Sequence, residues 1–321
     1  MSGDGSGTGP HPRSHLRRLT AQQRGFALAL GAILIWSFWP VFTRHGVTRS
    51  LTPDDIVLLR FTVGGVLFLP FLVVQAKSIP PKAWIAGFGL AICQGAPFVL
   101  LMASGLRFAP ASHAASLATG LSPLFATLLG ALLFAEPIAK TRWLGLVLIV
   151  GGAGALVAMS GSGPIVRGDL LFVAAAAMAS IYIVCVPRSG LTSFQAAGMV
   201  SVYSMILFVP VYLLIGGGQL PVAPTAEIVL QGLYQGVLMA FVSFIFLNSA
   251  IRRLGSSRIS ALIALVPVIS LSLAIPVLGE WPSQIETISA VLIGAGVYFA
   301  AQAHRVWRPF PFRDRAAARV A

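Results

Sequence analysis

Two prolines and two glutamates recur at one spacing along the chain. Pro123 and Glu136 are repeated 144 residues later by Pro267 and Glu280. Each proline falls in the middle of a long apolar run, where it would leave the carbonyl four residues earlier without a backbone donor. Each glutamate closes its run, at the helix end where the macrodipole disfavours a carboxylate. These positions predict gating or cavity roles for the prolines and ion-paired gates for the glutamates. The alternatives are packing kinks for the prolines, and interfacial structural roles or proton coupling for the glutamates.

Arg60 lies within another apolar run, about two turns from its start. Ionisable residues inside membrane helices are costly and often functional, so Arg60 is a candidate for binding a substrate carboxylate. An arginine this close to a helix end could instead extend its guanidinium to the interface. Trp36 and Tyr182 could form a cavity wall or anchor their helices at the interface. The polar candidates for substrate contact, with helix–helix hydrogen bonding as their alternative, are Gln94, Ser116, Gln235, Asn248 and Ser260.

Glu136 and His113 are ionisable, so each needs an ion-pair partner or contact with solvent. For Glu136, the cations that follow it in sequence, Lys140 and Arg142, are the predicted partners. His113 stands near the start of its apolar run, where a single histidine is typical of a solvated interface residue. A proton relay is the alternative for His113. The sequence has no other evident proton carrier, so it does not predict the energy source.

No catalytic or nucleotide-binding motif accompanies these residues. The sequence has no G-x-x-x-x-G-K-[ST] loop, no H-E-x-x-H pair and no G-x-S-x-G elbow. Its two cysteines, Cys93 and Cys185, lie in apolar runs, as packing residues do. We therefore expect no enzymatic activity, cofactor or metal.

The apolar runs that position these residues are predicted to be membrane helices. The chain has 321 residues, of which 57% are hydrophobic and 10% charged, against about 25% charged in a typical soluble domain. A membrane helix needs roughly 20 mostly apolar residues. We predict an all-α membrane protein with ten spans at 26–42, 56–74, 83–102, 112–134, 143–160, 169–186, 194–215, 228–247, 259–278 and 287–303.

The basic residues predict the orientation of these helices. With a cytoplasmic N-terminus, 17 of the 22 Lys and Arg residues fall in cytoplasmic segments and four in outer ones, with Arg60 inside a span. The positive-inside rule therefore favours the inner (plasma) membrane with both termini cytoplasmic. The net charge of +13 does not indicate nucleic-acid binding, because the basic residues are dispersed over tails and short loops. The predicted partners are the lipid bilayer and a small-molecule substrate.

The spacing of 144 residues extends beyond the prolines and glutamates and defines a repeat. Ser112, Ser116 and the segment 147–149 recur at the same offset as Ser256, Ser260 and 291–293. We predict two repeats, 24–160 and 167–303, flanked by disordered basic tails at 1–23 and 304–321. Since each repeat has five spans, the second copy must enter the membrane from the opposite side, as in many secondary transporters.

These repeated segments resemble the EamA-type repeat of the drug/metabolite transporter (DMT) superfamily. The resemblance covers about residues 26–302 and includes Trp36 and Arg60. It implies a cavity lined by spans one to four and six to nine. Spans five and ten would lie outside that cavity, where they could form a homodimer contact. The second repeat departs from the pattern, because Ala179 and Val200 stand near the places of Trp36 and Arg60.

The sequence thus predicts a secondary transporter that moves a small organic metabolite or drug-like solute by alternating access, through export or exchange. A channel-like facilitator is one alternative, although no continuous polar stripe runs along the helices. A membrane-embedded transferase is another, although the interfacial carboxylate or histidine cluster that it requires is not evident.

Overall fold

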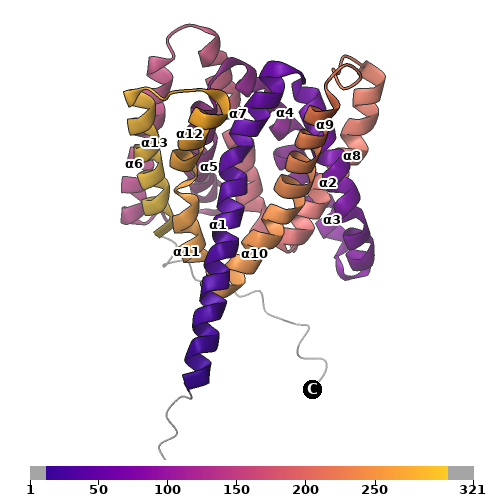
Figure 1. Cartoon of the computed structure of the whole chain (residues 1–321). Helices are drawn as coiled ribbons and strands as arrows, with labels where there is room; N and C mark the ends of the chain where they lie inside the picture. The colour runs from indigo at the N-terminus through magenta and orange to yellow at the C-terminus, as the bar shows by residue number, and fades with distance from the viewer. Residues whose placement is uncertain (1–11, 303–321) are drawn as a thin grey trace, which may run out of the picture.

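The computed structural model describes residues 12–302, which form a bundle of long helices (Figure 1). Within this part of the chain, ten helical segments are long and apolar enough to cross a membrane, as predicted. The end of the bundle at the top of Figure 1 is called the upper end. It holds the connections 50–52, 109–110, 160–163, 216–224 and 279–283. The lower end holds the connections 79–80, 135–139, 189–192 and 255.

The two halves of the chain contain matching sets of helices. The first half comprises α1 (Pro12–Arg49), α2 (Pro53–Gln75), the short η1 (Ala76–Ser78), α3 (Pro81–Gln94), α4 (Ala96–Phe108), α5 (Ala111–Phe134) and α6 (Lys140–Met159). The second comprises α7 (Pro164–Cys185), η2 (Val186–Arg188), α8 (Ser193–Ile215), α9 (Thr225–Gln231), η3 (Gly232–Val242), α10 (Ser243–Leu254), α11 (Ser256–Ile263), α12 (Val266–Leu278) and α13 (Gln284–Gln302). Because α1 begins at the lower end and α7 at the upper end, the halves are inverted, as predicted.

The structure corrects the predicted N-terminal tail. Helix α1 begins at Pro12, so residues 12–23, which we predicted to be disordered, are helical. The segment between Pro12 and Pro40 contains no further proline, the residue that most strongly ends a helix. Residues 1–11 and the predicted C-terminal tail 304–321 lie outside the described residues.

Equivalent helices in the two halves begin with the same cap. In α2, Thr52 and Asp55 form a capping box, in which each side chain accepts a hydrogen bond from the other's backbone N–H. In α8, Thr192 and Gln195 form the same arrangement. Such caps satisfy N–H groups that the first turn leaves without partners. The matching caps support the pairing of α2 with α8.

The third and eighth spans both depart from regular α-helix, at Gln94-Gly95 and around Gln235-Gly236. The third span breaks at Gly95, directly after Gln94, and the backbone N–H of Ala96 donates instead to Ser204 Oγ at 3.1 Å. In the eighth span, Gln235 lies in η3, an 11-residue π-helix. Irregular backbone at membrane depth is tolerated where protein or a cavity surrounds it, and π-helical turns are frequent at functional sites.

The two repeated prolines have different outcomes. Helix α5 continues through Pro123 as one segment, and Thr127 Oγ1 donates to the Pro123 carbonyl at 2.8 Å. The ninth span is instead divided into α11 and α12, with Pro267 in the first turn of α12. Pro267 therefore makes no mid-helix kink, because a proline in a first turn has no backbone hydrogen bond to lose. The gating or cavity role of both prolines stays a prediction.

The fifth and tenth spans, α6 and α13, pack side by side at one edge of the bundle (Figure 1). A Cβ added to Gly145 would lie 2.6 Å from the Gly296 carbonyl oxygen, so glycine permits this close approach. Gly151 and Gly154 have open space beside them. A homodimer through α6 and α13 stays a prediction.

Candidate functional site

A buried polar network joins the first and eighth spans close to Arg60. We call it the Arg60 network, and its members are Trp39, Thr43, Arg60, Gln231 and Gln235. The Gln235 amide oxygen accepts hydrogen bonds from Trp39 Nε1 at 2.9 Å and from the Arg60 guanidinium at 3.4 Å. The Gln235 amide nitrogen donates to Thr43 Oγ1 at 2.9 Å and to Gln231 at 3.3 Å.

The backbone of η3 places Gln235 against α2. A Cβ on Gly236 would lie 3.2 Å from the Leu59 carbonyl oxygen, and a Cβ on Gly64 would lie 2.8 Å from the Ala240 methyl group. These two glycines therefore let the helices approach closely. The π-helix and the glycines together bring the Gln235 amide beside Arg60.

Arg60 is a buried cation without a matching anion. Its side chain is only 9% exposed, so it does not extend to the interface, which excludes the snorkelling alternative. None of the ion pairs in the described part of the chain includes Arg60. Its guanidinium carbon lies 5.4 Å from the centre of the Trp39 ring, and its Nε has no hydrogen-bond partner. Burying an uncompensated charge costs several kcal/mol, so this position favours binding of an anion.

Other buried polar atoms of the first, second and third spans also lack partners. Trp36 Nε1, on the face of α1 that carries Trp39, donates to no acceptor, and Thr62 Oγ1 is likewise unpaired. At the α3–α4 break, Gln94 Oε1 has no donor. The start of α4 reaches the network because the Phe98 ring stacks on Trp39 with centroids 6.1 Å apart. A polar ligand would satisfy such atoms, each of which costs about 1–3 kcal/mol while unpaired.

The remaining predicted contact residues are not joined to this network. Ser116 is buried in α5, and Tyr182 packs against the core from α7. Asn248 donates to the Phe244 carbonyl of its own helix at 2.9 Å. Within the described residues, no hydrogen bond or ring contact links these three to Arg60. The side chain of Ser260 lies outside the described residues.

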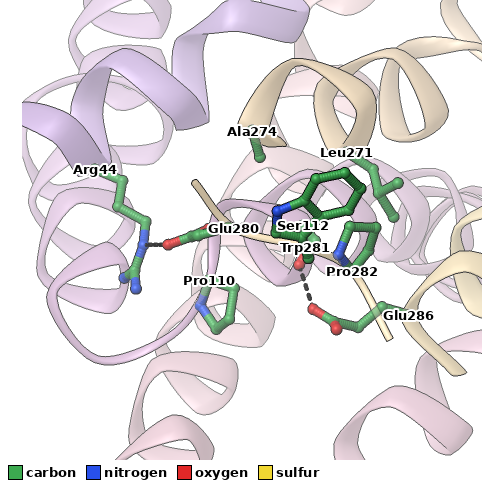
Figure 2. A pocket seen from close by; sticks show the side chains of 9 residues that line it. All are labelled: Arg44, Pro110, Ser112, Leu271, Ala274, Glu280, Trp281, Pro282 and Glu286. Atoms are coloured by element: carbon green, nitrogen blue, oxygen red, sulfur yellow. Dashed lines mark hydrogen bonds and ion pairs between the residues drawn. The ribbon is translucent and has the colours of Figure 1, made fainter. Parts of the chain in front are cut away.

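At the upper end, Glu280 forms an ion pair with Arg44 (Figure 2). The Arg44 guanidinium also donates to the carbonyls of Leu106 and Ala109, at 2.7 and 2.6 Å. The second Glu280 oxygen accepts from the backbone N–H of Ala111 at 3.1 Å. We call this set the upper latch. It joins residues 44–111 of the first repeat to Glu280 of the second.

At the lower end, Glu136 forms an ion pair with Arg188, which also donates to the Val184 carbonyl at 2.6 Å. The Arg188 guanidinium carbon lies 4.0 Å from the Phe134 ring centre. We call this contact the lower latch. The predicted partner Lys140 was wrong, because the cation comes from the other repeat. Arg142 lies close enough to Glu136 to interact with it electrostatically.

The two latches are equivalent under the repeat. Arg188 follows Arg44 at the same offset of 144 that relates Glu280 to Glu136. Each latch therefore joins the arginine of one repeat to the glutamate of the other, at opposite ends of the bundle. This offset was present in the sequence and could have identified both arginines.

A cavity of about 210 Å³ opens beside the upper latch. Figure 2 shows Arg44 and Glu280 on one side of it, with Ser112 and Glu286 on the other. Leu271 and Ala274 of α12 are its buried lining residues, whereas Trp281 is largely exposed. We call this cavity the vestibule, and it borders the Arg44–Glu280 contact between the repeats.

His113 is not the solvated interface residue that we predicted. Its side chain is 2% exposed, and its Nδ1 lies 2.8 Å from Asp169 Oδ1. Its Nε2 lies 3.6 Å from Glu286 Oε1. The sequence reasoning missed both carboxylates, because they follow loops far from His113 along the chain.

Comparisons with known proteins agree with this architecture. The EamA-like transporter family profile matches residues 23–158 and 166–302, one match per repeat. A Salmonella typhimurium protein described as a probable amino-acid metabolite efflux pump is 26% identical over 94% of this chain and 99% of its own length. A Streptantibioticus cattleyicolor protein described as a probable terminal-alkyne amino-acid exporter is 25% identical over 70% of this chain and 73% of its own.

A solved crystal structure shares the fold. It superposes with a TM-score of 0.60 over 90% of this chain and 99% of its own, at 23% sequence identity. The family match spans both repeats, and the ten spans and inverted halves are those that the resemblance implied. The chain belongs to the EamA-like transporter family and is a multi-pass membrane transporter of small metabolites.

Proposed function

We propose that the protein is a secondary transporter that exports small amino-acid-like metabolites across the inner membrane by alternating access. The observation that carries this proposal is Arg60, a buried guanidinium with an unpaired Nε and no carboxylate partner among the described residues. A substrate carboxylate supplies the missing anion. The names of the Salmonella and Streptantibioticus relatives support an amino-acid substrate.

The groups around Arg60 suit the two charged ends of an amino acid. The guanidinium offers a planar fork of donors that matches a carboxylate. Gln94 Oε1, an acceptor without a donor, lies at the α3–α4 break, and Phe98 of α4 stacks on Trp39 of the network. In our proposal the substrate carboxylate binds Arg60, and its ammonium group donates to Gln94. The unpaired Trp36 Nε1 adds a donor for the carboxylate.

The two latches supply the gates of this mechanism. Opening the upper end requires that the Arg44–Glu280 pair separate, and opening the lower end requires the same of Glu136 and Arg188. Because the latches are equivalent, one movement of the repeats past each other breaks one while it keeps the other. The positive-inside rule assigns the lower end to the cytoplasm, so export runs from the lower to the upper end.

Uptake of three matched compounds into proteoliposomes tests the proposal. The compounds are an amino acid, the amine that lacks its carboxylate and the acid that lacks its amino group. We expect saturable counterflow of the amino acid, with the amine competing at least about tenfold more weakly, since a charge-assisted hydrogen bond contributes about 1.5–3 kcal/mol. Equal competition by the amine would contradict the Arg60 assignment. Flux that rises without saturation would favour a channel-like facilitator.

A further inference from the structure

His113 has a carboxylate opposite each ring nitrogen. Nδ1 faces Asp169 Oδ1 at 2.8 Å, and Nε2 faces Glu286 Oε1 at 3.6 Å. Asp169 is 1% exposed and its other oxygen accepts from Ser160 Oγ at 2.5 Å. Glu286 also accepts from Ser112 Oγ at 2.6 Å and from the Ser283 backbone N–H at 2.8 Å. We call His113, Asp169 and Glu286 the His113 site.

The doubly protonated imidazole suits this geometry best, because it donates to Asp169 and places a positive charge between two carboxylates. A neutral histidine donates from one nitrogen and presents a lone pair at the other. In this site that lone pair would face a carboxylate oxygen, and the two carboxylates would share a buried space without a cation. The imidazolium provides two N–H donors and one positive charge. With the proton bound, the imidazolium attracts both carboxylates. Without it, the two carboxylates repel each other.

The His113 site connects the two repeats at the upper end. His113 and Ser112 belong to the start of α5 in the first repeat, whereas Asp169 and Glu286 begin α7 and α13 in the second. Ala111, two residues before His113, donates to Glu280 of the upper latch. Glu286 also lines the vestibule, and its side chain is 11% exposed.

The other ionisable groups on the helices around α5 lie at the lower end, are exposed or have other partners. The charge of the His113 site is therefore set by His113, Asp169 and Glu286. Helix α12 carries no ionisable residue, and those of α6 lie at its lower end. Arg107 of α4 and Arg167 of α7 are exposed, and Arg44 of α1 is committed to Glu280. His45 of α1 faces Glu227 of α9 at 3.4 Å.

We propose that the His113 site is a proton-binding site that holds the upper end closed. A proton from water in the vestibule binds the imidazole and joins α5 to α7 and α13. When the proton leaves, Asp169 and Glu286 repel each other, and the first repeat separates from the second at this end. The proposal rests on the upper end being a gate, but it does not depend on which solute is transported.

Thiol accessibility beneath the gate tests the site without any substrate. Ala274 lines the vestibule and is 2% exposed. In a protein whose Cys93 and Cys185 are replaced by serine, Ala274→Cys is labelled with a membrane-impermeant thiol reagent. Its labelling rate at each pH is divided by that of Ser162→Cys in the exposed 160–163 loop, which corrects for thiolate chemistry. We expect this ratio to rise by about tenfold between about pH 5.5 and pH 8.5.

Substitutions in the His113 site, compared with a control substitution at His45, show whether the pH dependence of labelling comes from this site. His113→Gln cannot titrate and should make the ratio independent of pH. His45→Gln, the other described histidine near the upper end, should leave the rise intact. Glu286→Gln retains the histidine and should move the rise to lower pH, because one of two carboxylates that favour the imidazolium is gone. A flat ratio with His113 intact, or a rise that persists in His113→Gln, would overturn the proposal.

Discussion

Replacing Arg60 by alanine is expected to weaken binding of a carboxylate-bearing substrate by about 100-fold while the melting temperature stays equal or rises. The affinity falls because two charge-assisted hydrogen bonds, each worth about 1.5–3 kcal/mol, are lost. The stability does not fall, because the variant removes a buried charge that no carboxylate compensates in the described structure. Isothermal titration and thermal unfolding of the purified protein measure the two quantities.

Arg60→Lys and Arg107→Ala separate charge from geometry in this experiment. Lysine retains the positive charge but not the planar fork, so we expect affinity to fall by about tenfold. Arg107 is exposed at the upper end, and its removal should change neither quantity. Unchanged affinity in both Arg60 variants would remove the carboxylate assignment. A large loss of stability in Arg60→Ala would show that the arginine is structural.

Replacing Arg44 by alanine is expected to release the upper latch and to favour the upper-open form by roughly 10-fold to 100-fold. Arg44 pairs with Glu280 and also holds the carbonyls of Leu106 and Ala109. Losing hydrogen bonds to a charged group costs about 1.5–3 kcal/mol, and 1.4 kcal/mol is a factor of ten. Thiol labelling of Leu271→Cys, in the lining of the vestibule, should accelerate accordingly.

The charge-reversed pair provides the control for Arg44. Combining Arg44→Glu with Glu280→Arg in one protein restores the ion pair but not the bonds to the carbonyls, because a carboxylate has no N–H to donate. Labelling should therefore return part of the way to its original rate. Arg188→Ala at the lower latch, where the ion pair is about one third exposed, should have a smaller effect at its own end. Labelling that Arg44→Ala leaves unchanged would exclude a latch role.

The sequence predicted the architecture because hydrophobic length and internal repetition are local properties. Ten apolar runs and one offset of 144 residues determined the spans, the repeats and the inverted arrangement. Glu136 and Glu280 were predicted as gates on the same basis, and both form ion pairs between the repeats. The shared offset of Arg44 and Arg188 followed from the same comparison but was missed, because both arginines stand at span ends where basic residues are common.

The details of the site depended on contacts that no local pattern encodes. Arg60 was placed near a helix end, and its burial follows from helices that pack against α2, among them η3. Trp39 enters the network through Gln235, 196 residues away in the chain. His113 acquires its carboxylates from α7 and α13. Neither the π-helix nor the division of the ninth span at Pro267 could be predicted, since tertiary packing decides between a kink and a break.

The central claim is that two equivalent latches close opposite ends of one pathway, and a reversible cross-link at each latch tests it most directly. Cysteines replace Arg44 and Glu280 in one protein, and Glu136 and Arg188 in another, in a background without Cys93 and Cys185. A short, reducible bifunctional thiol reagent then joins each pair. Alternating access predicts that either cross-link stops net transport in proteoliposomes and that reduction restores it. Transport that continues at its full rate with either pair cross-linked would contradict the account.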